Sequence, residues 1–238
     1  MFQKIEALSP ERHMALRFNR STTYRFAENM TAAPLTYKEL QQAARYYPIV
    51  FSSAEEPVPQ ALLSVGPAQN AYVSAEGRWR VPYVPAHVRR YPFILGKTDE
   101  EGNYALCIDP DAPHFQFDQG EPLFTANGDS TDLLNQALEF VKTLQQEFMD
   151  TRKILAPLPE NSLLESRQLN IRQHQADAAP LTVKGMYAVD MKKLREMDAE
   201  TLGEWVKNGL MGLVYAHQAS LANLQAVADI QSRPQGVE

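Results

Sequence analysis

The distribution of proline constrains this 238-residue chain more than any other feature of its sequence. Most of its 16 prolines lie before Gly128, whereas Ser130–Leu155 contains none. Because proline lacks a backbone N–H and its ring clashes with the preceding helical turn, it is excluded from helix interiors. The first half of the chain is therefore limited to strands, turns and short helices, and a long helix becomes possible only after Ser130.

The proline-free stretch carries the apolar periodicity of a long helix that begins at Asp132. Its apolar residues recur at intervals of three and four, which places them on one face of the helix. They are Leu134, Ala137, Leu138, Val141, Leu144 and Phe148. Nearer the end of the chain, Asp198 has the character of a helix cap and Gly209 that of a helix stop. A final helix follows, with Leu210, Val214, His217, Leu221 and Leu224 on one stripe.

The first half of the chain contains one well-specified short helix and several strands. Thr36 and Glu39 have the spacing of a capping box, and Pro48 ends the helix that they begin. The predicted strands are short apolar runs bounded by turn residues: Ile49–Ser52, Gln60–Val65, Ala71–Ser74, Phe93–Leu95 and Tyr104–Ile108. A turn at Glu101–Asn103 joins the last two, and connections this short favour antiparallel pairing.

These elements predict an α+β fold. An antiparallel sheet, built from hairpins of the N-terminal half, is expected to pack against the long helix and the C-terminal helices. One domain over residues 1–238 is the main expectation, and a division into a mixed α/β part (1–128) and a mainly helical part (129–238) is the alternative. The final helix is expected to be integral to the core, because it presents too much apolar surface to leave in water.

Charge and cysteine content bound the class of protein. With 23 basic and 29 acidic residues the net charge is -6, which argues against a surface for nucleic acid as the main role. No stretch approaches the roughly 20 apolar residues that cross a bilayer, and the first residues lack the apolar run of a secretory signal. A single cysteine, Cys107, suits a reducing compartment. We expect a soluble, cytoplasmic protein without a membrane span, and self-association remains open.

The segment Trp79–Phe93 is the expected functional surface. Three prolines stiffen its backbone, so its side chains are placed with little entropy left to lose. Arginine forks beside aromatic rings suit a carboxylate, a phosphate or a peptide segment. The candidate binding residues are Trp79, Tyr83, His87, Arg89, Arg90, Tyr91 and Asp109. Since consecutive helical residues point about 100° apart, one arginine is expected to pair with Asp109. The other is then either solvated or free to meet a ligand.

Other chemistry is indicated only weakly. Asp109, Asp111 and His114 follow a predicted strand and could converge on a divalent metal. The alternative is a turn in which the aspartate side chains bind nearby backbone N–H groups. Cys107 is expected to be a buried structural thiol, and His217 a hydrogen-bonded core histidine. No cofactor and no catalytic residue is predicted, because no phosphate-binding loop, nucleophile elbow or metalloprotease motif occurs.

Several stretches, taken in order, resemble the bacterial SapC family. They are PLTYKELQQAARYYPIVF, ALLSVGPAQNAYVSAEGRW, YVPAHVRRYPF, LCID followed by PLF, KGMYAVDMKKL and GLMGLVYAHQASLANLQ. Together they extend from about Pro34 to Gln225, and the segment between about Ala156 and Ala179 resembles the family least. The most distinctive part is the tryptophan followed by the proline- and arginine-rich run and by LCID.

The resemblance implies a single SapC-like domain and little about chemistry. The family takes its name from an accessory gene of a surface-layer protein system, and its members often lie near genes for outer-membrane receptors and flavin-dependent tryptophan halogenase-like proteins. No set of catalytic residues comes with it. The expected function is that of a non-enzymatic accessory protein that recognises a peptide or protein partner. The alternative is a metal- or anion-dependent enzyme that modifies a peptide or small molecule beside the halogenase-like proteins.

Overall fold

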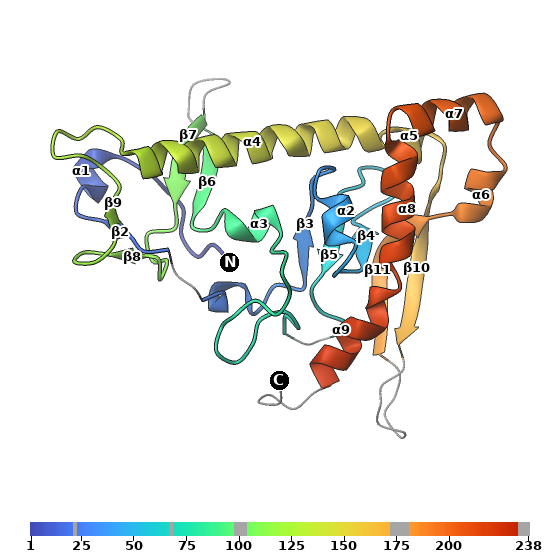
Figure 1. Cartoon of the computed structure of the whole chain (residues 1–238), viewed down its shortest axis with the longest axis horizontal. Helices are drawn as coiled ribbons and strands as arrows, with labels where there is room; N and C mark the ends of the chain where they lie inside the picture. The colour runs from blue at the N-terminus through green and yellow to red at the C-terminus, as the bar shows by residue number, and fades with distance from the viewer. Residues whose placement is uncertain (21–22, 67–68, 98–103, 172–180, 233–238) are drawn as a thin grey trace.

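The structure, a computed structural model of the chain, describes residues 1–20, 23–66, 69–97, 104–171 and 181–232. Three β-sheets and several helices are arranged along one long helix, α4 (Asp132–Leu155) (Figure 1). All pairings between the described strands are antiparallel. The predicted α+β class, with antiparallel sheets beside a long helix and C-terminal helices, is confirmed.

The largest sheet has five strands in the order β10-β11-β4-β5-β3. Their bounds are β3 (Ala32–Pro34), β4 (Ile49–Phe51), β5 (Pro59–Leu62), β10 (Leu164–Ile171) and β11 (Leu181–Val189). The predicted strands Ile49–Ser52 and Gln60–Val65 correspond to β4 and β5. Tyr187 of β11 lies opposite Phe51 of β4, so the sheet joins both halves of the chain.

The strands β10 and β11 were not predicted, and they lie in the segment expected to be mainly helical. The five-stranded sheet therefore combines the predicted strands of the N-terminal half with two strands from the C-terminal half. β10 is an edge strand, and its side chains from Ser166 to Gln168 are exposed. A strand with so little buried surface lacks the apolar alternation by which half-buried strands are recognised.

Two small sheets form the other end of the molecule. One has the order β1-β7-β6 and the other the order β8-β2-β9. Their strands are β1 (Glu6–Ala7), β2 (Arg17–Phe18), β6 (Phe93–Lys97), β7 (Tyr104–Ile108), β8 (Phe115–Gln116) and β9 (Glu121–Pro122). The predicted hairpin is present as β6 and β7, and its turn at Glu101–Asn103 lies outside the described residues. The predicted strand Ala71–Ser74 forms only one bridge, between Val73 and Trp79.

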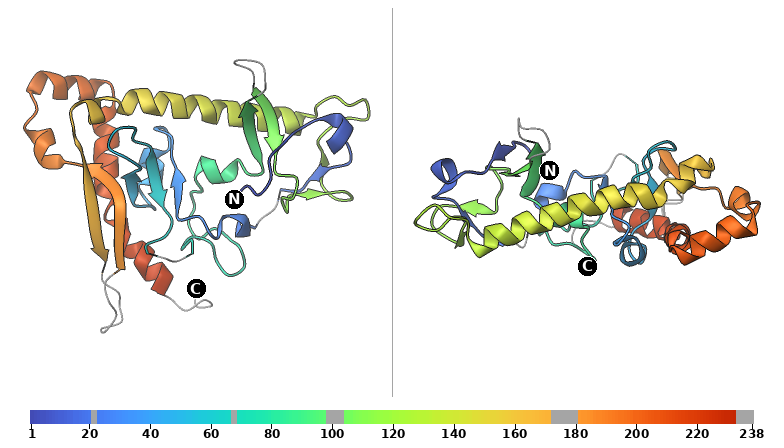
Figure 2. Two further views of the ribbon diagram at one scale, coloured as in Figure 1. Left: turned by 180° about the vertical axis from the view of Figure 1, so that it is seen from behind. Right: turned by 90° about the horizontal axis from the view of Figure 1, so that it is seen from above.

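The helix α4 connects two hydrophobic clusters. Leu134 and Val141, in its first half, pack with Phe93 and Ile108 of the small-sheet end. Leu155, its last residue, belongs to the larger cluster around the five-stranded sheet. Figures 1 and 2 show the helix running along one side of the molecule, from the strands β6 and β7 towards the C-terminal helices. The predicted start at Asp132 is confirmed, and of the predicted apolar face Leu134, Val141 and Leu144 are buried.

The C-terminal helices cover the five-stranded sheet. After α5 (Pro157–Glu160) they are α6 (Met191–Arg195), α7 (Ala199–Lys207), α8 (Leu210–Ser220) and α9 (Asn223–Ser232). Asp198 accepts the N–H of Thr201 at 2.8 Å, and Gly209 takes the left-handed conformation (φ 87°) that ends α7 and begins α8. The predicted cap and stop are thus confirmed. Leu210, Val214 and Leu224 are buried, as expected of a helix integral to the core.

Short helices complete the first half. They are α1 (Pro10–His13), a 3-10 turn η1 (Arg25–Ala27), α2 (Leu40–Ala43) and α3 (Ala86–Arg89). The predicted capping box is half formed: Glu39 Oε2 accepts the N–H of Thr36 at 3.0 Å. The Thr36 hydroxyl does not complete the box, because it donates to Glu147 of α4 at 3.1 Å. α2 is consequently shorter than the predicted helix and gives way to a turn after Ala43.

Candidate functional site

The segment Trp79–Phe93 is held in place by a buried tyrosine of the core. The indole Nε1 of Trp79 donates to the hydroxyl of Tyr47 at 2.7 Å, and this hydroxyl donates in turn to the carbonyl oxygen of Tyr83. Tyr47 has no exposed surface. Two of the predicted binding residues, Trp79 and Tyr83, are therefore engaged in positioning the segment.

Glu39 is the buried carboxylate that fixes the start of α3. Its Oε1 accepts from the hydroxyl of Tyr83 and from the N–H of Ala86, both at 2.7 Å. Together with the bond from Thr36, the carboxylate has three donors and is 6% exposed. Burial and the charge of Glu39 raise the pKa of Tyr83, which keeps the phenol protonated. Sequence reasoning assigned Glu39 only to a helix cap and missed this link.

Among the described residues, Asp109 forms an ion pair with neither Arg89 nor Arg90, so the predicted ion pair is wrong. The carboxylate is fully buried; its Oδ2 accepts from the N–H of Gln3 at 2.9 Å and from the hydroxyl of Tyr91 at 3.1 Å. Its Oδ1 accepts from the N–H of Asp111 at 3.4 Å. These donors occupy both oxygens. The first comes from a residue 106 positions away, which no local pattern could reveal.

The turn interpretation of Asp109, Asp111 and His114 is confirmed. In addition to the bond from Asp111, the carbonyl oxygen of Asp109 accepts the N–H of Ala112 at 3.1 Å. His114 is 6% exposed and stacks on Phe18 with a centroid distance of 5.8 Å, and burial lowers its pKa to about 4. Within the described part of the chain, no three His, Cys, Asp or Glu side chains are grouped so that they could hold a metal ion.

The two arginines of the segment lie in different surroundings, as their positions on a helix require. Arg89 is exposed; its Nε donates to the carbonyl oxygen of Val84 at 3.0 Å, and its guanidinium lies 5.5 Å from the ring centroid of Phe140. Arg90 is partly buried, and its guanidinium lies 5.6 Å from the ring centroid of Phe2. Its buried Nε has no hydrogen-bond partner among the described residues, and burial lowers the pKa of Arg90.

His87 and Arg90 line a pocket of about 270 Å³ between α3 and α4, which we call the α3–α4 pocket. The helix α4 contributes Gln145, Phe148, Met149, Thr151 and Arg152, and the facing wall consists of Pro34, Pro57, Val58 and Pro59. The edge of the His87 ring faces Phe148 at a centroid distance of 6.5 Å. Arg152 was not predicted, although it lies four residues after Phe148 and so on the same helical face.

The charge of the α3–α4 pocket is positive. Burial and the neighbouring Arg90 lower the pKa of His87 to about 3, so the imidazole is neutral at pH 7. Arg90 and Arg152 supply the positive charge, and no carboxylate is found among the described residues of the lining. Arg90 and Arg152 thus place positive charge beside the apolar side chains of the pocket.

The remaining predicted residues serve the core. Tyr91 is 6% exposed and stacks on Phe26 at 4.3 Å. Cys107 is 6% exposed on β7, and burial raises the pKa of its thiol, which confirms a buried structural cysteine. Of the seven predicted binding residues, the structure brings His87 and Arg90 together at a pocket. The other five contact the rest of the protein. Trp79 and Tyr83 position the segment, Tyr91 contacts Phe26 and Asp109, and Arg89 lies over Phe140 of α4.

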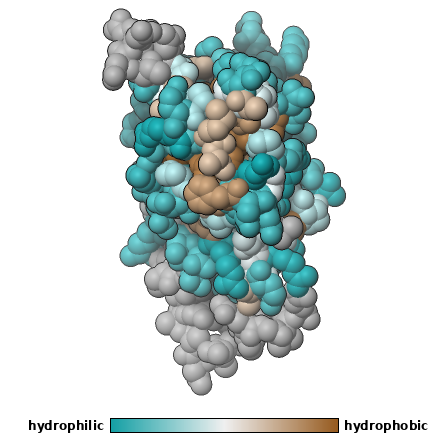
Figure 3. Space-filling view, turned by 90° about the vertical axis from the view of Figure 1, so that its left-hand side faces the viewer, coloured by the Kyte–Doolittle hydropathy of each residue, from teal (hydrophilic) through white to brown (hydrophobic). Residues whose placement is uncertain are grey.

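Other surface features lack an unpartnered donor of this kind. Two larger hollows, of about 430 and 490 Å³, lie beside α9 and on the open face of the five-stranded sheet. Buried side-chain atoms without a hydrogen-bond partner in the described residues are Arg90 Nε, His114 Nδ1 and Gln218 Oε1, and neither hollow is lined by any of these residues. Figure 3 views the small-sheet end, where apolar surface shows among hydrophilic side chains.

Fold and pocket together define an α+β protein with a cationic pocket on the surface of its long helix. The chain belongs to the SapC family, whose family model matches residues 8–227. This confirms the resemblance drawn from the sequence. A search of the curated proteins finds no match to this chain, and neither does a search of the solved structures. Among the described residues, no helix combines the length and apolarity needed to cross a membrane.

Proposed function

We propose that the protein is a non-enzymatic accessory protein that recognises a peptide or protein partner through the α3–α4 pocket. The observation that carries this proposal is the partly buried, cationic side chain of Arg90 at a pocket whose facing wall, formed by Pro34, Pro57, Val58 and Pro59, is apolar. Membership of the SapC family supports a partner from a surface-layer or outer-membrane system, met in the cytoplasm.

The recognised group is an anion of the partner. A carboxylate placed at Arg90 would accept from the guanidinium in a charge-assisted bond, which is roughly twice as strong as a neutral one. Arg152 is exposed and contributes the weaker attraction of a surface charge. The net charge of -6 makes nucleic acid a poor partner for the protein as a whole.

The apolar walls favour a polypeptide as the source of that anion. Pro34, Pro57 and Pro59 offer ring surfaces fixed by the backbone, and Met149 is 42% exposed at the opposite side. Methionine adapts to partner side chains of different shape. Ordered walls keep the entropy cost of binding low.

Photocrosslinking tests the proposal. A photoreactive amino acid at position 149 is expected to capture a partner from the source cell, and the same residue at position 142, exposed on α4 outside the pocket, is the control. Adding Arg90→Gln should reduce the yield about tenfold, which corresponds to 1.4 kcal/mol. Arg195→Gln, an exposed arginine on α6, should leave the yield unchanged.

Equal capture by the parent and by Arg90→Gln would contradict the proposal. A captured partner whose mass changes only when the pocket is intact would favour the alternative, an anion-dependent enzyme acting beside halogenase-like proteins. Capture of a second copy of this chain would identify the partner as the protein itself.

A further inference from the structure

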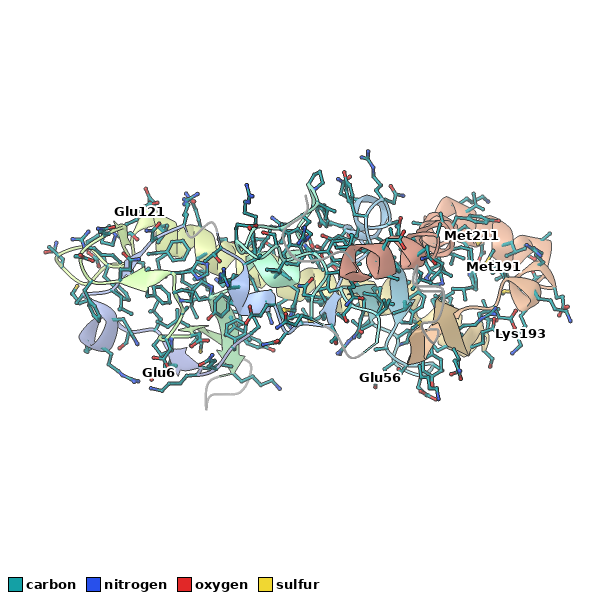
Figure 4. The ribbon with its side chains drawn as sticks, turned by 90° about the horizontal axis from the view of Figure 1, so that it is seen from below. Glu6, Glu56, Glu121, Met191, Lys193 and Met211 are labelled. Atoms are coloured by element: carbon teal, nitrogen blue, oxygen red, sulfur yellow. The ribbon has the colours of Figure 1, made fainter. Side chains whose placement is uncertain are left out.

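A second hollow, of about 360 Å³, adjoins the α3–α4 pocket along the same helix. Pro57 and Arg152 line both hollows, and we call the two adjoining hollows together the charged groove. Its far end is lined by Glu55, Glu56 and Glu160. Figure 4 labels Glu56 at the edge of the molecule.

The two ends of the charged groove carry opposite charge. Glu55, Glu56 and Glu160 form no ion pair within the described residues, whereas Arg90 and Arg152 lie at the other end and at the junction. The acids of α4 nearby are already paired: Lys38 holds Glu147 at 3.1 Å and Lys153 holds Asp150 at 3.7 Å. The arginines and glutamates of the groove are thus the charges left for a ligand.

The wall that bears Glu55 and Glu56 is ordered by its own hydrogen bonds. The N–H of Glu56 donates to Ser53 Oγ at 3.0 Å, and the N–H of Val58 donates to Ser52 Oγ at 3.1 Å. Pro57, between them, is buried and fixes the backbone. The backbone that carries Glu55 and Glu56 is therefore ordered before any partner arrives, which lowers the cost of binding.

We infer that the charged groove takes an extended segment of a partner polypeptide that places an acidic side chain at Arg90 and a basic side chain at Glu55, Glu56 and Glu160. This inference rests on the proposed function and adds the charge pattern of the partner. A free anion would gain nothing from the acidic end, and a phosphodiester chain would be repelled by it. A polypeptide with unlike charges along one strand satisfies both ends.

Blocked peptides of alanine and serine test the inference by fluorescence anisotropy. One set carries a glutamate and a lysine, in both orders and with successively longer spacers, and reference peptides carry the glutamate alone, the lysine alone or neither. The peptide with the fitting spacer should bind the wild type about two- to fivefold more tightly than the glutamate-only peptide, as expected of an exposed ion pair.

Variants separate this inference from the proposed function. The double variant Glu55→Gln/Glu56→Gln should remove the preference for lysine and keep the binding of the glutamate-only peptide. Arg90→Gln should lower the affinity for every glutamate-bearing peptide about tenfold. The exposed residues Glu204 and Arg195 provide matched controls. Glu204→Gln and Arg195→Gln should change neither the preference for lysine nor the affinity for glutamate-bearing peptides.

Two results would overturn the inference. One is equal binding of the lysine-bearing and glutamate-only peptides to the wild type, and the other is a preference for lysine that persists in the double variant. In either case the proposed function stands if Arg90→Gln still weakens binding. Two other results would overturn both the inference and the proposed function. In one, Arg90→Gln binds the glutamate-bearing peptides as tightly as the wild type does. In the other, the wild type binds none of the peptides.

Discussion

The imidazole of His217, on α8, donates from Nδ1 to the carbonyl oxygen of Ile49 on β4 over 2.8 Å. Its Nε2 accepts the N–H of Val189 on β11 over 3.2 Å. A carbonyl oxygen can only accept and a backbone N–H can only donate, so the two contacts define the neutral Nδ1–H tautomer. The predicted core histidine is confirmed, and it ties one helix to two neighbouring strands.

Acidification is expected to destabilise the protein through this histidine. Burial lowers the pKa of His217 in the folded state to about 4, against roughly 6.5 in an unfolded chain. The unfolded state therefore takes up the proton first. The stabilisation is complete above about pH 6.5 and is lost as the pH falls towards 4, by roughly 3 kcal/mol for this one group. Urea denaturation at a series of pH values measures the loss.

The control for this pH dependence is His217→Gln. This variant should be less stable than the parent at pH 7, because it loses one of the two backbone contacts, but it should lose less on acidification. His87 and His114, whose pKa values are also lowered by burial, add to the slope of both proteins. An identical slope in parent and variant would contradict the assignment to His217.

Removal of the Glu39 carboxylate is expected to loosen the start of α3. Glu39→Ala leaves the N–H groups of Thr36 and Ala86 and the hydroxyl of Tyr83 without their acceptor, at a cost on the order of 3 kcal/mol. Glu39→Gln keeps one carbonyl oxygen and should cost less. Chemical denaturation measures both changes. Glu204→Gln, at an exposed position, should leave the free energy of unfolding unchanged. An equal loss of stability in Glu204→Gln would show that the effect is not specific to the Glu39 carboxylate.

Tyr91→Phe is expected to cost more stability than the loss of either arginine. It removes the hydroxyl that Asp109 accepts inside the core, at roughly 1–3 kcal/mol. Arg89→Ala and Arg90→Ala each lose a contact with an aromatic ring, which is worth roughly 0.5–1 kcal/mol. Thermal melts of the three variants rank them. A larger loss of stability in either arginine variant would contradict this ranking and would support an ion pair between that arginine and Asp109.

Truncation after Gly209 is expected to abolish cooperative folding. The deleted helices contribute Leu210, Val214, Leu224 and Val227 to the larger cluster, and each buried side chain of this size is worth roughly 1.5–3 kcal/mol. The truncated chain should be insoluble or should lose its near-ultraviolet circular dichroism while keeping helical signal. A truncated chain that melts as cooperatively as the parent would show that these helices are dispensable.

The sequence predicted those helices and strands whose ends and faces are marked by residues close together in the chain. The start of α4 at Asp132, the strand Tyr104–Ile108 and the pair of Asp198 and Gly209 follow from caps, stops and periodicity within a few residues. The hairpin β10–β11 was missed. β10 is an edge strand whose side chains Ser166 to Gln168 are exposed, whereas β11 lies inside the sheet and pairs with the distant β4, a contact that local patterns do not show. The fold class survived this omission, since both strands pair antiparallel with the rest.

The candidate site was predicted in part. The stiff, arginine-bearing segment was found, and two of its residues line the α3–α4 pocket. The partners of that segment come from elsewhere in the chain: Gln3 donates to Asp109, Trp79 donates to Tyr47, and Arg152 lines the same pocket as Arg90. Such contacts depend on tertiary packing, which the order of residues does not display.

The connection of two hydrophobic clusters by α4 restricts how the length of this chain can change. An α-helix turns by about 100° and rises about 1.5 Å with each residue. One residue inserted between Val141 and Leu155 would rotate one cluster against the other by that angle, and the apolar face could not meet both. Lengthening by whole turns would preserve the phase but would separate β6 and β7 from the five-stranded sheet. The helix thus acts as a gauge that sets both the spacing and the rotation of the two ends of the molecule.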